Sequence, residues 1–582
     1  MSYILGINCY HADSSACLLL NGQLIIALEE ERINRIKHWG GFPKLSIIKC
    51  LESASINIGD IDCVAINQNF KANLFRKIKY GVFNLNNFNF FLDKIKIKMN
   101  RSNILKTIED EIGKLKKNCK LIEAEHHLSH ISSAYYDSKY NKAVNLSVDG
   151  FGDFASVAWG PGIGSDIKID NKIIFPHSLG IFYEAFTQFL GFHNYGDEYK
   201  LMGLSAYGKP TELKKLSNII TLIGHGEFKL NLEYFTHHQN KSDYSWSNSF
   251  PITNTLFNKK IQNLFGPPRK APEQLSDYHY NIAASVQKFY EDTLFYILDF
   301  LYKKYKIDNL TLSGGCAQNS LANGKILKNS KFSSLFIPAN PGDGGGAVGA
   351  ANIAWKKISN LPPKRNSTAY LGLSFKNEDI KLLIDKNKLF LNNKDFAVEF
   401  VKNEDLLCLN IAKSISMQKV VGWFQGKMEW GPRALGNRSI ISDPRNKDIK
   451  NTLNNKIKRR ESFRPFAPSI LSGYENEWFC DFIEEDKFMA RVLKFKENKK
   501  TLIPGVVHVD GTGRLQTVTT NDNPRYYKLI KNFYDITGIP ILLNTSFNEN
   551  EPIVSNPTEA LDCFLRTKMD ILVLENYIIS RK

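Results

Sequence analysis

The first thirty residues alternate between apolar runs and short polar turns, a pattern that predicts paired β-strands. The apolar runs lie at residues 3–7, 16–20 and 23–28. Asn21 and Gly22 separate the last two runs and form a strong two-residue hairpin signal. The bend between the first two runs is polar and carries His11 and Asp13. Hydroxyls and backbone N–H groups in such a bend are suited to contact a phosphate, so we expect a hairpin with a functional first bend.

Glycine-rich turns follow several later apolar strands. They lie at residues 149–153, 313–319 and 341–346, and the last two precede helix-like stretches at 320–327 and 347–355. A glycine turn between a strand and a helix lets a phosphate or a ribose approach the helix N-terminus closely. One such turn is a weak signal, but several within the first 350 residues predict a nucleotide-binding α/β domain.

A second α/β segment follows a linker. Residues 361–367 contain Pro, Lys and Ser and have the composition of a connecting segment. Beyond them, apolar strands at 420–424 and 539–543 flank a basic cluster at 433–464 that Gly and Pro punctuate. We therefore expect two domains, residues 1–360 and 369–582. The sequence has no apparent internal repeat.

The composition is that of a globular protein. The 582 residues are 43% hydrophobic and 23% charged, which argues against disorder or a coiled coil over the whole chain. No apolar run approaches the roughly 18 residues of a membrane span, and residues 1–28 lack the pattern of a signal peptide. The nine cysteines form no CxxC pair, which favours reduced thiols. We expect a cytoplasmic protein with no membrane partner.

The formal net charge of +17 admits nucleic acid, an acidic membrane or a phosphorylated small molecule as a partner. Residues 71–120 hold 13 Lys and Arg against 4 Asp and Glu, and we interpret them as a solvated helical insertion. The cluster at 433–464 has ordered turns with apolar neighbours, which favours a lined pocket for an anion. Arginine forks bind phosphate-like groups with two parallel hydrogen bonds.

A second chemical signal is a pair of histidines. His126 and His130 are four residues apart, so a helix would place them on one face, whereas His127 would be rotated by about 100°. Asp149 and Asp343 are acids beside glycine at predicted strand ends. Two His and two Asp form a mixed nitrogen and oxygen set that suits Fe(II), Mn or Zn. Ordinary helix histidines without a metal are the alternative.

A set of short motifs also occurs in a recognisable order, at residues 10–16, 29–35, 126–130, 149–152, 200–204, 313–316, 437–439, 463–468 and 543–548. Together they resemble the O-carbamoyltransferases that tailor nodulation factors, cephalosporins and aminoglycosides. The resemblance implies an N-terminal domain of the actin/sugar-kinase (ASKHA) type, related to the tRNA threonylcarbamoyl-transfer subunit, and a YrdC-like C-terminal domain. It implies that the C-terminal domain makes carbamoyl-adenylate from carbamoyl phosphate and ATP. The N-terminal domain, holding iron, would then pass the carbamoyl group to an acceptor hydroxyl.

The resemblance also implies residue roles. The implied iron ligands are His126, His130, Asp149 and Asp343. The implied nucleotide contacts are Lys37, Gly314 and Gly315. We also expect Mg²⁺ as a cofactor that binds with ATP. The implied carbamoyl phosphate site comprises Arg433, Lys458, Arg464, Arg514, Asn544 and Ser546. We expect Arg459 and Arg460 to lie at the surface.

One departure from the family pattern concerns the first bend. Some relatives place His directly before Asp, but here Ala12 separates His11 from Asp13. Either His11 or Asp13 then acts on the acceptor hydroxyl, and both stay candidate catalytic residues.

Three other functions compete with this interpretation. A tRNA-modifying carbamoyl transfer would use the positive charge, although we expect no nucleic-acid partner. Hydrogenase-maturation carbamoylation involves CxxC zinc fingers and an acylphosphatase-like start, neither of which this sequence has. A nucleotide-binding scaffold would release no pyrophosphate. The sequence does not identify the acceptor or the oligomeric state, but we expect residues 226–272, with Trp246, to set acceptor specificity.

Overall fold

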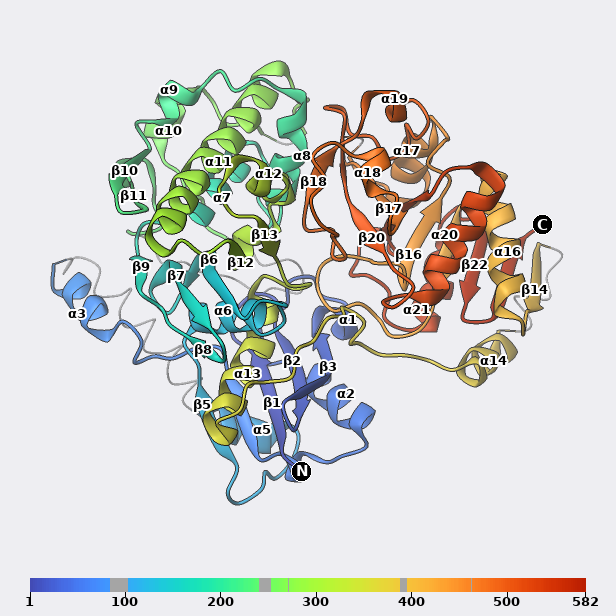
Figure 1. The fold of residues 1–582 in the computed structure, drawn as a ribbon, viewed down its shortest axis with the longest axis horizontal. Coiled ribbons are helices and arrows are strands. Elements are labelled where there is room, and N and C mark those ends of the chain that lie inside the picture. Colours follow the sequence, from blue (N-terminus) through green and yellow to red (C-terminus); the bar gives the residue numbers. More distant parts are fainter. Residues whose placement is uncertain (84–102, 240–252, 271, 388–394, 462) are drawn as a thin grey trace. The chain divides into compact units, whose positions relative to one another are not determined.

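The computed structural model describes all residues except 84–102, 240–252, 271, 388–394 and 462. The chain divides into two compact units. Unit 1 comprises Met1–Ala322 and Ile326–Ser367, and unit 2 comprises Asn323–Lys325 and Thr368–Lys582. Both units combine helices with β-sheets, so the predicted α/β class is confirmed (Figure 1). Among the described residues, no helix combines the length and the apolar character needed to cross a bilayer.

Unit 1 begins with a five-stranded sheet of order β3-β2-β1-β4-β5. Strands β1, β2 and β3 pair antiparallel, and β4 and β5 continue the sheet parallel to β1. The strands are β1 (Tyr3–Asn8), β2 (Ser15–Leu20), β3 (Gln23–Glu29), β4 (Cys63–Ile66) and β5 (Lys120–Glu123). The three predicted N-terminal strands and the turn at Asn21 and Gly22 are confirmed.

The second sheet of unit 1 repeats this strand order. β6 pairs antiparallel with β7, which pairs antiparallel with β9, while β12 and β13 extend the sheet parallel to β6. The strands are β6 (Lys142–Gly152), β7 (Ala155–Ile163), β8 (Asp166–Ile167), β9 (Asn171–Ile174), β12 (Asn309–Ser313) and β13 (Ser334–Phe336). The sequence shows no such repeat, because an α/β topology depends on the periodicity of buried positions and not on residue identity.

Helices join and cover the two sheets of unit 1. The helix α13 (Gly346–Ser359) follows a short turn, η6 (Asp343–Gly345), and packs against β1 and α6 (His126–Tyr135). The other helices of unit 1 include α1 (Glu31–Asn34), α2 (Lys44–Ala54), α3 (Leu74–Phe83), α5 (Ile104–Glu111), α7 (Leu179–Phe189), α8 (Glu198–Leu204), α9 (Leu213–Leu216), α10 (Lys259–Phe265) and α11 (Asp277–Tyr305). The predicted helix at 320–327 is α12 (Ser320–Asn329).

Unit 2 is built on one sheet of order β14-β23-β22-β15-β16-β21-β17-β20. Two of its pairs, β15 with β22 and β17 with β20, are parallel, and the others are antiparallel. Its strands are β14 (Phe396–Phe400), β15 (Val421–Phe424), β16 (Arg438–Ser442), β17 (Ala467–Leu471), β20 (Gln516–Val518), β21 (Ile541–Ser546), β22 (Ile571–Leu574) and β23 (Tyr577–Arg581). A separate hairpin pairs β18 (Val492–Lys494) with β19 (Thr512–Arg514).

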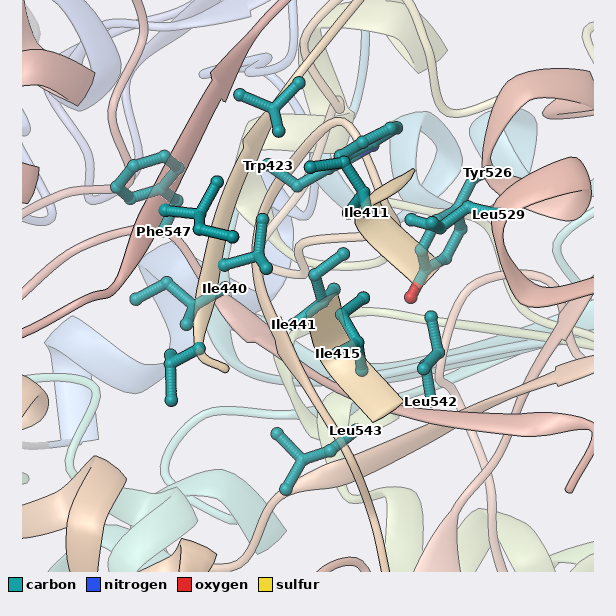
Figure 2. Close-up of a cluster of buried hydrophobic side chains, with 14 of the residues drawn as sticks. Ile411, Ile415, Trp423, Ile440, Ile441, Tyr526, Leu529, Leu542, Leu543 and Phe547 are labelled. Atoms are coloured by element: carbon teal, nitrogen blue, oxygen red, sulfur yellow. The ribbon is translucent and has the colours of Figure 1, made fainter. Parts of the chain in front are cut away.

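Four helices of unit 2, α14 (Asn377–Lys386), α16 (Glu404–Ser416), α20 (Pro524–Thr537) and α21 (Pro557–Arg566), accompany this sheet. Figure 2 shows Ile411 and Ile415 of α16 beside Ile441 of β16 and Leu542 of β21. All four side chains are buried. Burying each such side chain contributes about 1.5–3 kcal/mol, so the sheet that carries the site residues has a well-packed core.

Two interpretations of the sequence fall partly or wholly on residues that the structure does not describe. The basic segment 71–120 includes α3 and α5, but residues 84–102 lie outside the described part. Trp246, expected to set acceptor preference, also lies outside it.

The contact between α6 and α13 depends on a glycine. A Cβ on Gly349 of α13 would overlap the carbonyl oxygen of Ser129 of α6, and the Ser132 hydroxyl donates to the carbonyl of Gly349 over 3.1 Å. This close approach holds α6 in place, and α6 carries the two predicted histidine ligands.

We predict that Gly349→Ala destabilises the protein, although alanine in a helix is normally about 1 kcal/mol better than glycine. Overpacking against a backbone carbonyl typically costs about 1–3 kcal/mol. Denaturant unfolding measures the change. Gly59→Ala is the control, because a Cβ there meets its nearest atom at an ordinary 3.6 Å. A Gly349→Ala protein as stable as the wild type would contradict the tight contact.

Candidate functional site

Four predicted ligands converge in unit 1. α6 brings His126 and His130 to one face, with their Nε2 atoms 3.0 Å apart. Oδ2 of Asp149, from β6, lies 2.9 Å from His126 Nε2 and 3.3 Å from His130 Nε2. Oδ1 of Asp343, from η6, lies 3.5 Å and 3.2 Å from the same two nitrogens. One ligand atom from each residue lies within 4.8 Å of all the others.

This arrangement fits a single metal ion. Ligand atoms bound about 2.1 Å from a common ion lie roughly 3.0–3.4 Å from one another, close to the separations between these nitrogens and oxygens. All four residues are buried, and burying two carboxylates is costly unless a positive charge balances them. His127 takes no part, because its Nδ1 pairs with the Ser147 hydroxyl at 2.9 Å. The helical spacing predicted this division among the three histidines.

The electrostatics of the cluster also indicate a cation. Burial lowers the pKa of His130, but hydrogen bonds to Asp149 and Asp343 outweigh burial and raise it to about 10. Burial raises the pKa of Asp343, but the charge of His11 and the hydrogen bonds from His11 and His130 hold it below its usual range. Two carboxylates thus favour a positive charge at the position where the imidazole nitrogens meet.

The Gly314 and Gly315 turn orients one of these ligands. Gly315 N–H donates to Asp149 Oδ1 over 3.0 Å. Gly314 has a left-handed φ of 87°, and a Cβ there would overlap the carbonyl oxygen of Val148. The turn was predicted to contact a nucleotide, which stays a prediction, and in the structure it orients a candidate metal ligand. On the opposite side, the carboxylate of Asp153 accepts from His126 N–H at 2.9 Å.

The two candidate residues of the first bend contact different partners. His11 Nδ1 lies 2.5 Å from Asp343 Oδ2, so His11 contacts the metal centre through one of the ligands. Asp13 points to a different partner, with its Oδ1 2.7 Å from His38 Nδ1. Lys37, the predicted nucleotide contact, lies half-buried in the turn just before His38. His38 was not predicted as a site residue, although it directly follows Lys37 in the sequence.

Lys458 and Ser546, both predicted for the anion site in unit 2, are in contact. Lys458 is fully buried at the end of η7 (Leu453–Lys458), and its ammonium group donates to the backbone oxygen of Ser546. It also donates to Asn548 O over 2.9 Å and to Asn548 Oδ1 over 2.6 Å. Asn548 was not predicted as a site residue. Its position two residues after Ser546 was the available signal.

Arginines gather near this lysine in the sequence and near one another in space. Burial lowers the pKa of Arg514 well below its usual range, and the charges of Arg433, Arg460 and Arg464 lower it further. The carboxylate of Asp486 acts in the opposite direction. Like charges that approach one another in a protein are stable when an anion completes the group. The cluster therefore has the character of an anion site.

Asn544 connects the strands around this cluster. Its amide nitrogen donates to Ala434 O over 3.2 Å, Ser469 Oγ over 3.1 Å and Gln516 Oε1 over 3.0 Å. Ala434 directly follows Arg433 in the sequence, and Gln516 lies two residues after Arg514. These hydrogen bonds join Asn544 to the segments that carry Arg433 and Arg514.

One prediction about the basic cluster is wrong. Arg460, expected at the surface, is half-buried: its Nε donates to Asn454 Oδ1 over 2.9 Å, and its guanidinium lies 4.9 Å from the ring centre of Phe466. Arg459 does lie at the surface, with 62% of its side chain exposed. Arg459 has a left-handed φ of 44°, and this turn separates the two neighbours. The density of positive charge in the sequence did not indicate that these two neighbours differ in exposure.

Arg438 has a structural role. Its side chain is fully buried and donates to the carbonyl oxygens of Gln425, Gly426 and Leu373 over 2.6–3.1 Å. The guanidinium also lies 3.6 Å from the ring centre of Phe424. This arginine holds backbone carbonyls together, so it adds no charge to the anion site.

Comparisons with known proteins match both halves of the chain to one family. The model of the carbamoyltransferase N-terminus matches residues 3–352, and that of the carbamoyltransferase C-terminus matches residues 412–581. An uncharacterised Synechocystis protein, sll1178, is 36% identical over 100% of this chain and 97% of its own length. The nodulation protein NolNO of Sinorhizobium fredii is 33% identical over 99% of this chain and 80% of its own length.

Among solved structures, HypF of T. kodakarensis matches with a TM-score of 0.30 and 14% identity, over 62% of this chain and 48% of that one. A likeness at that score supports no argument about fold or activity. The two family models together span most of the sequence: residues 3–352 include the four candidate metal ligands, and residues 412–581 include the arginine cluster. The chain therefore belongs to the carbamoyltransferase family.

Proposed function

We propose that this carbamoyltransferase makes carbamoyl-adenylate from carbamoyl phosphate and ATP in unit 2. In unit 1 it then transfers the carbamoyl group to a hydroxyl of a small-molecule or sugar-containing acceptor. The observation that carries the proposal is the arginine cluster around Arg514, which lies in the half that matches the carbamoyltransferase C-terminus. Both substrates are phosphorylated anions, and a gathering of guanidinium groups is suited to bind them.

The chemistry assigned to unit 2 forms one anhydride bond. Carbamoyl phosphate loses its phosphate to water, and an oxygen of the resulting carbamate attacks the α-phosphorus of ATP with loss of pyrophosphate. Arg433, Arg464 and Arg514 would bind the phosphate oxygens and offset their charge in the transition state. Arg460 belongs to the same group, because its positive charge also lowers the pKa of Arg514. Lys458 fixes the loop of Ser546 and Asn548 at the side of the site.

The chemistry assigned to unit 1 breaks that anhydride. His126, His130, Asp149 and Asp343 would hold the metal ion, for which we propose Fe(II); Mn or Zn suits the same donor set. A metal there supplies positive charge that offsets the negative charge of the departing AMP phosphate. Lys37 is suited by its charge to contact the nucleotide. His11 contacts Asp343 and so keeps that ligand in place.

The proposed fold relationships follow the same division. The repeated strand order of the two sheets in unit 1 supports the assignment to the actin/sugar-kinase type, because each sheet has three antiparallel strands extended by two parallel ones. The YrdC-like character of unit 2 rests on the resemblance of its sequence motifs.

The test is incubation of the protein, loaded with ferrous ion, with ATP and carbamoyl phosphate. We expect pyrophosphate only when both substrates are present, and carbamoylated product when a hydroxyl-bearing acceptor from a sugar and small-molecule screen is added. A protein that forms no pyrophosphate, or that forms it equally well without carbamoyl phosphate, would contradict the proposal.

We predict that Arg464→Ala lowers the rate of pyrophosphate formation by roughly tenfold to a hundredfold, because a hydrogen bond to a charged group is worth about 1.5–3 kcal/mol. Its metal content should stay unchanged, since Arg464 belongs to unit 2. The matched control is Arg459→Ala, because Arg459 is largely exposed and pairs with Glu549 at 3.0 Å. Equal rates in the two variants would place Arg464 outside the site.

We predict that His130→Ala prevents stoichiometric metal binding, because it removes one of the two imidazole ligands from the four-residue donor set. Elemental analysis after reconstitution with ferrous ion measures the effect. His193→Ala is the control, since His193 is an exposed histidine of the same unit. Full metal content in His130→Ala would refute the ligand set.

A further inference from the structure

The helix α3 presents an apolar face to solvent. The side chains of Phe75, Ile78 and Leu74 are 80%, 52% and 51% exposed. Leu74 and Ile78 are four residues apart, and Phe75 and Ile78 are three apart, so the three side chains are neighbours on one face of the helix. Exposed apolar residues are ordinary when they are scattered singly, whereas a group of them marks an interaction surface. We call these three residues the apolar face of α3.

The opposite side of α3 packs on unit 1. Tyr80 lies two residues beyond Ile78, which places it about 200° further around the helix. Its ring centre is 5.2 Å from that of Phe175. Just before the helix, the Asn73 side chain donates to the backbone oxygen of Asp153 over 2.8 Å. These contacts fix which side of α3 is turned inward, so the fold itself turns the apolar face outward. In Figure 1, α3 lies at the edge of unit 1.

Positive charge borders the apolar face on both sides. Lys77 is three residues from Leu74, and Lys79 is four residues from Phe75, so each lysine adjoins one edge of the face. Arg76 adds a third positive charge, and α3 contains no Asp or Glu. A helix with an apolar face, basic borders and no acidic residue has the pattern of helices that lie in the interface of an anionic bilayer.

Other occupants fit this face less well. A second copy of the helix would double its three positive charges without adding a negative one, and like charges repel across an interface. A nucleic acid would pair with the cations and stack on Phe75, but Leu74 and Ile78 have no ring on which a base could stack. A bilayer removes all three apolar side chains from water and places anionic phosphates beside the basic ones.

We propose that α3 is a membrane-docking helix that lies in the headgroup region of an anionic bilayer. Its apolar face lies among the upper parts of the acyl chains, and Arg76 and Lys79, both exposed, lie against lipid phosphates. The expectation of no membrane partner rested on the length of apolar runs, which concerns spanning segments and not a helix that lies on the surface. The proposal is independent of the proposed chemistry, because α3 contains none of the predicted site residues.

The test is sedimentation of the full chain with vesicles of phosphatidylcholine alone or of equal parts phosphatidylcholine and phosphatidylglycerol. We expect binding only to the anionic vesicles, and release as salt rises, because mobile ions screen exposed charges. Phe75→Gln and Ile78→Gln should each weaken binding about tenfold, since each removes an apolar side chain from the bilayer. Lys79→Gln should weaken it about fivefold, since it removes one charge near the surface. Glutamine is a good helix former, so the helix itself should persist.

Leu382→Gln is the matched control. Leu382 is also an exposed apolar side chain of a ten-residue helix, α14, with 61% of its surface exposed. The first turn of α14 is acidic, with Glu378 and Asp379, so it should not approach an anionic surface. We expect the control to bind vesicles like the wild type. All the replaced side chains are exposed, and thermal unfolding of each variant should match that of the wild type.

A second measurement locates the helix directly. Phe75→Trp adds a tryptophan whose emission should shift to shorter wavelength with anionic vesicles and should be quenched by lipids brominated on their acyl chains. Leu382→Trp should show neither effect. An added tryptophan at position 75 that stays in water while the protein sediments would overturn the proposal, because another surface would then carry the binding.

Three results of the sedimentation would also overturn it. They are no binding to either kind of vesicle, equal binding to both kinds, and binding to anionic vesicles that Phe75→Gln and Ile78→Gln leave unchanged. Retention of tRNA at physiological salt that Phe75→Gln weakens, together with no vesicle binding, would assign the face to nucleic acid instead.

Discussion

The constraint on which unit 1 depends is the burial of two carboxylates against two imidazoles. Asp149 and Asp343 would repel each other and resist burial without a compensating positive charge. The fold brings them together from different segments, because β6 ends beside a glycine turn and η6 begins α13. α6 is held against α13 by the absence of a side chain at Gly349. The elements of unit 1 thus hold a set of ligands that is stable when it carries a cation.

In unit 2 the charges that lie close together are positive instead of negative. Arg433, Arg460 and Arg464 lie near half-buried Arg514, and a bound anion would offset their mutual repulsion. Only some of the residues behind the net charge of +17 therefore belong to this arginine cluster. Arg438 binds backbone carbonyls and Arg459 lies at the surface, and neither adds to the anion site. A candidate cation site in one unit and a candidate anion site in the other correspond to the two half-reactions proposed for the chain.

Residue spacing and strand pattern predicted much of this architecture. The hairpin at Asn21 and Gly22 and the pairing of His126 with His130 follow from local periodicity, which the sequence displays directly. Asp149 and Asp343 come from distant segments, and their place in the site followed from the resemblance to a family. The repeated sheet topology of unit 1 was not visible, because buried positions can repeat without repeating residues.

The contacts of His38 and Arg460 were not predicted for the same physical reason. His38 meets Asp13 only because two loops are fastened together, and Arg460 is half-buried only because Arg459 turns the chain. The spacing of residues along the sequence predicts neither contact. The glycines at 314 and 315 were predicted as nucleotide contacts, and the pattern did not reveal that the Gly315 N–H group donates to the carboxylate of Asp149.

The central claim is that one chain joins the carbamoyl group to AMP before it transfers that group to an alcohol. Carbamoyl phosphate labelled with ¹⁸O in its carbonyl group tests this most directly, because a carbamate oxygen that attacks ATP stays with AMP when the carbonyl carbon is transferred. The account predicts ¹⁸O in the phosphate of the released AMP, detected by mass spectrometry. Unlabelled AMP together with a carbamoylated acceptor would show that the group is transferred without an adenylate, and would contradict the account.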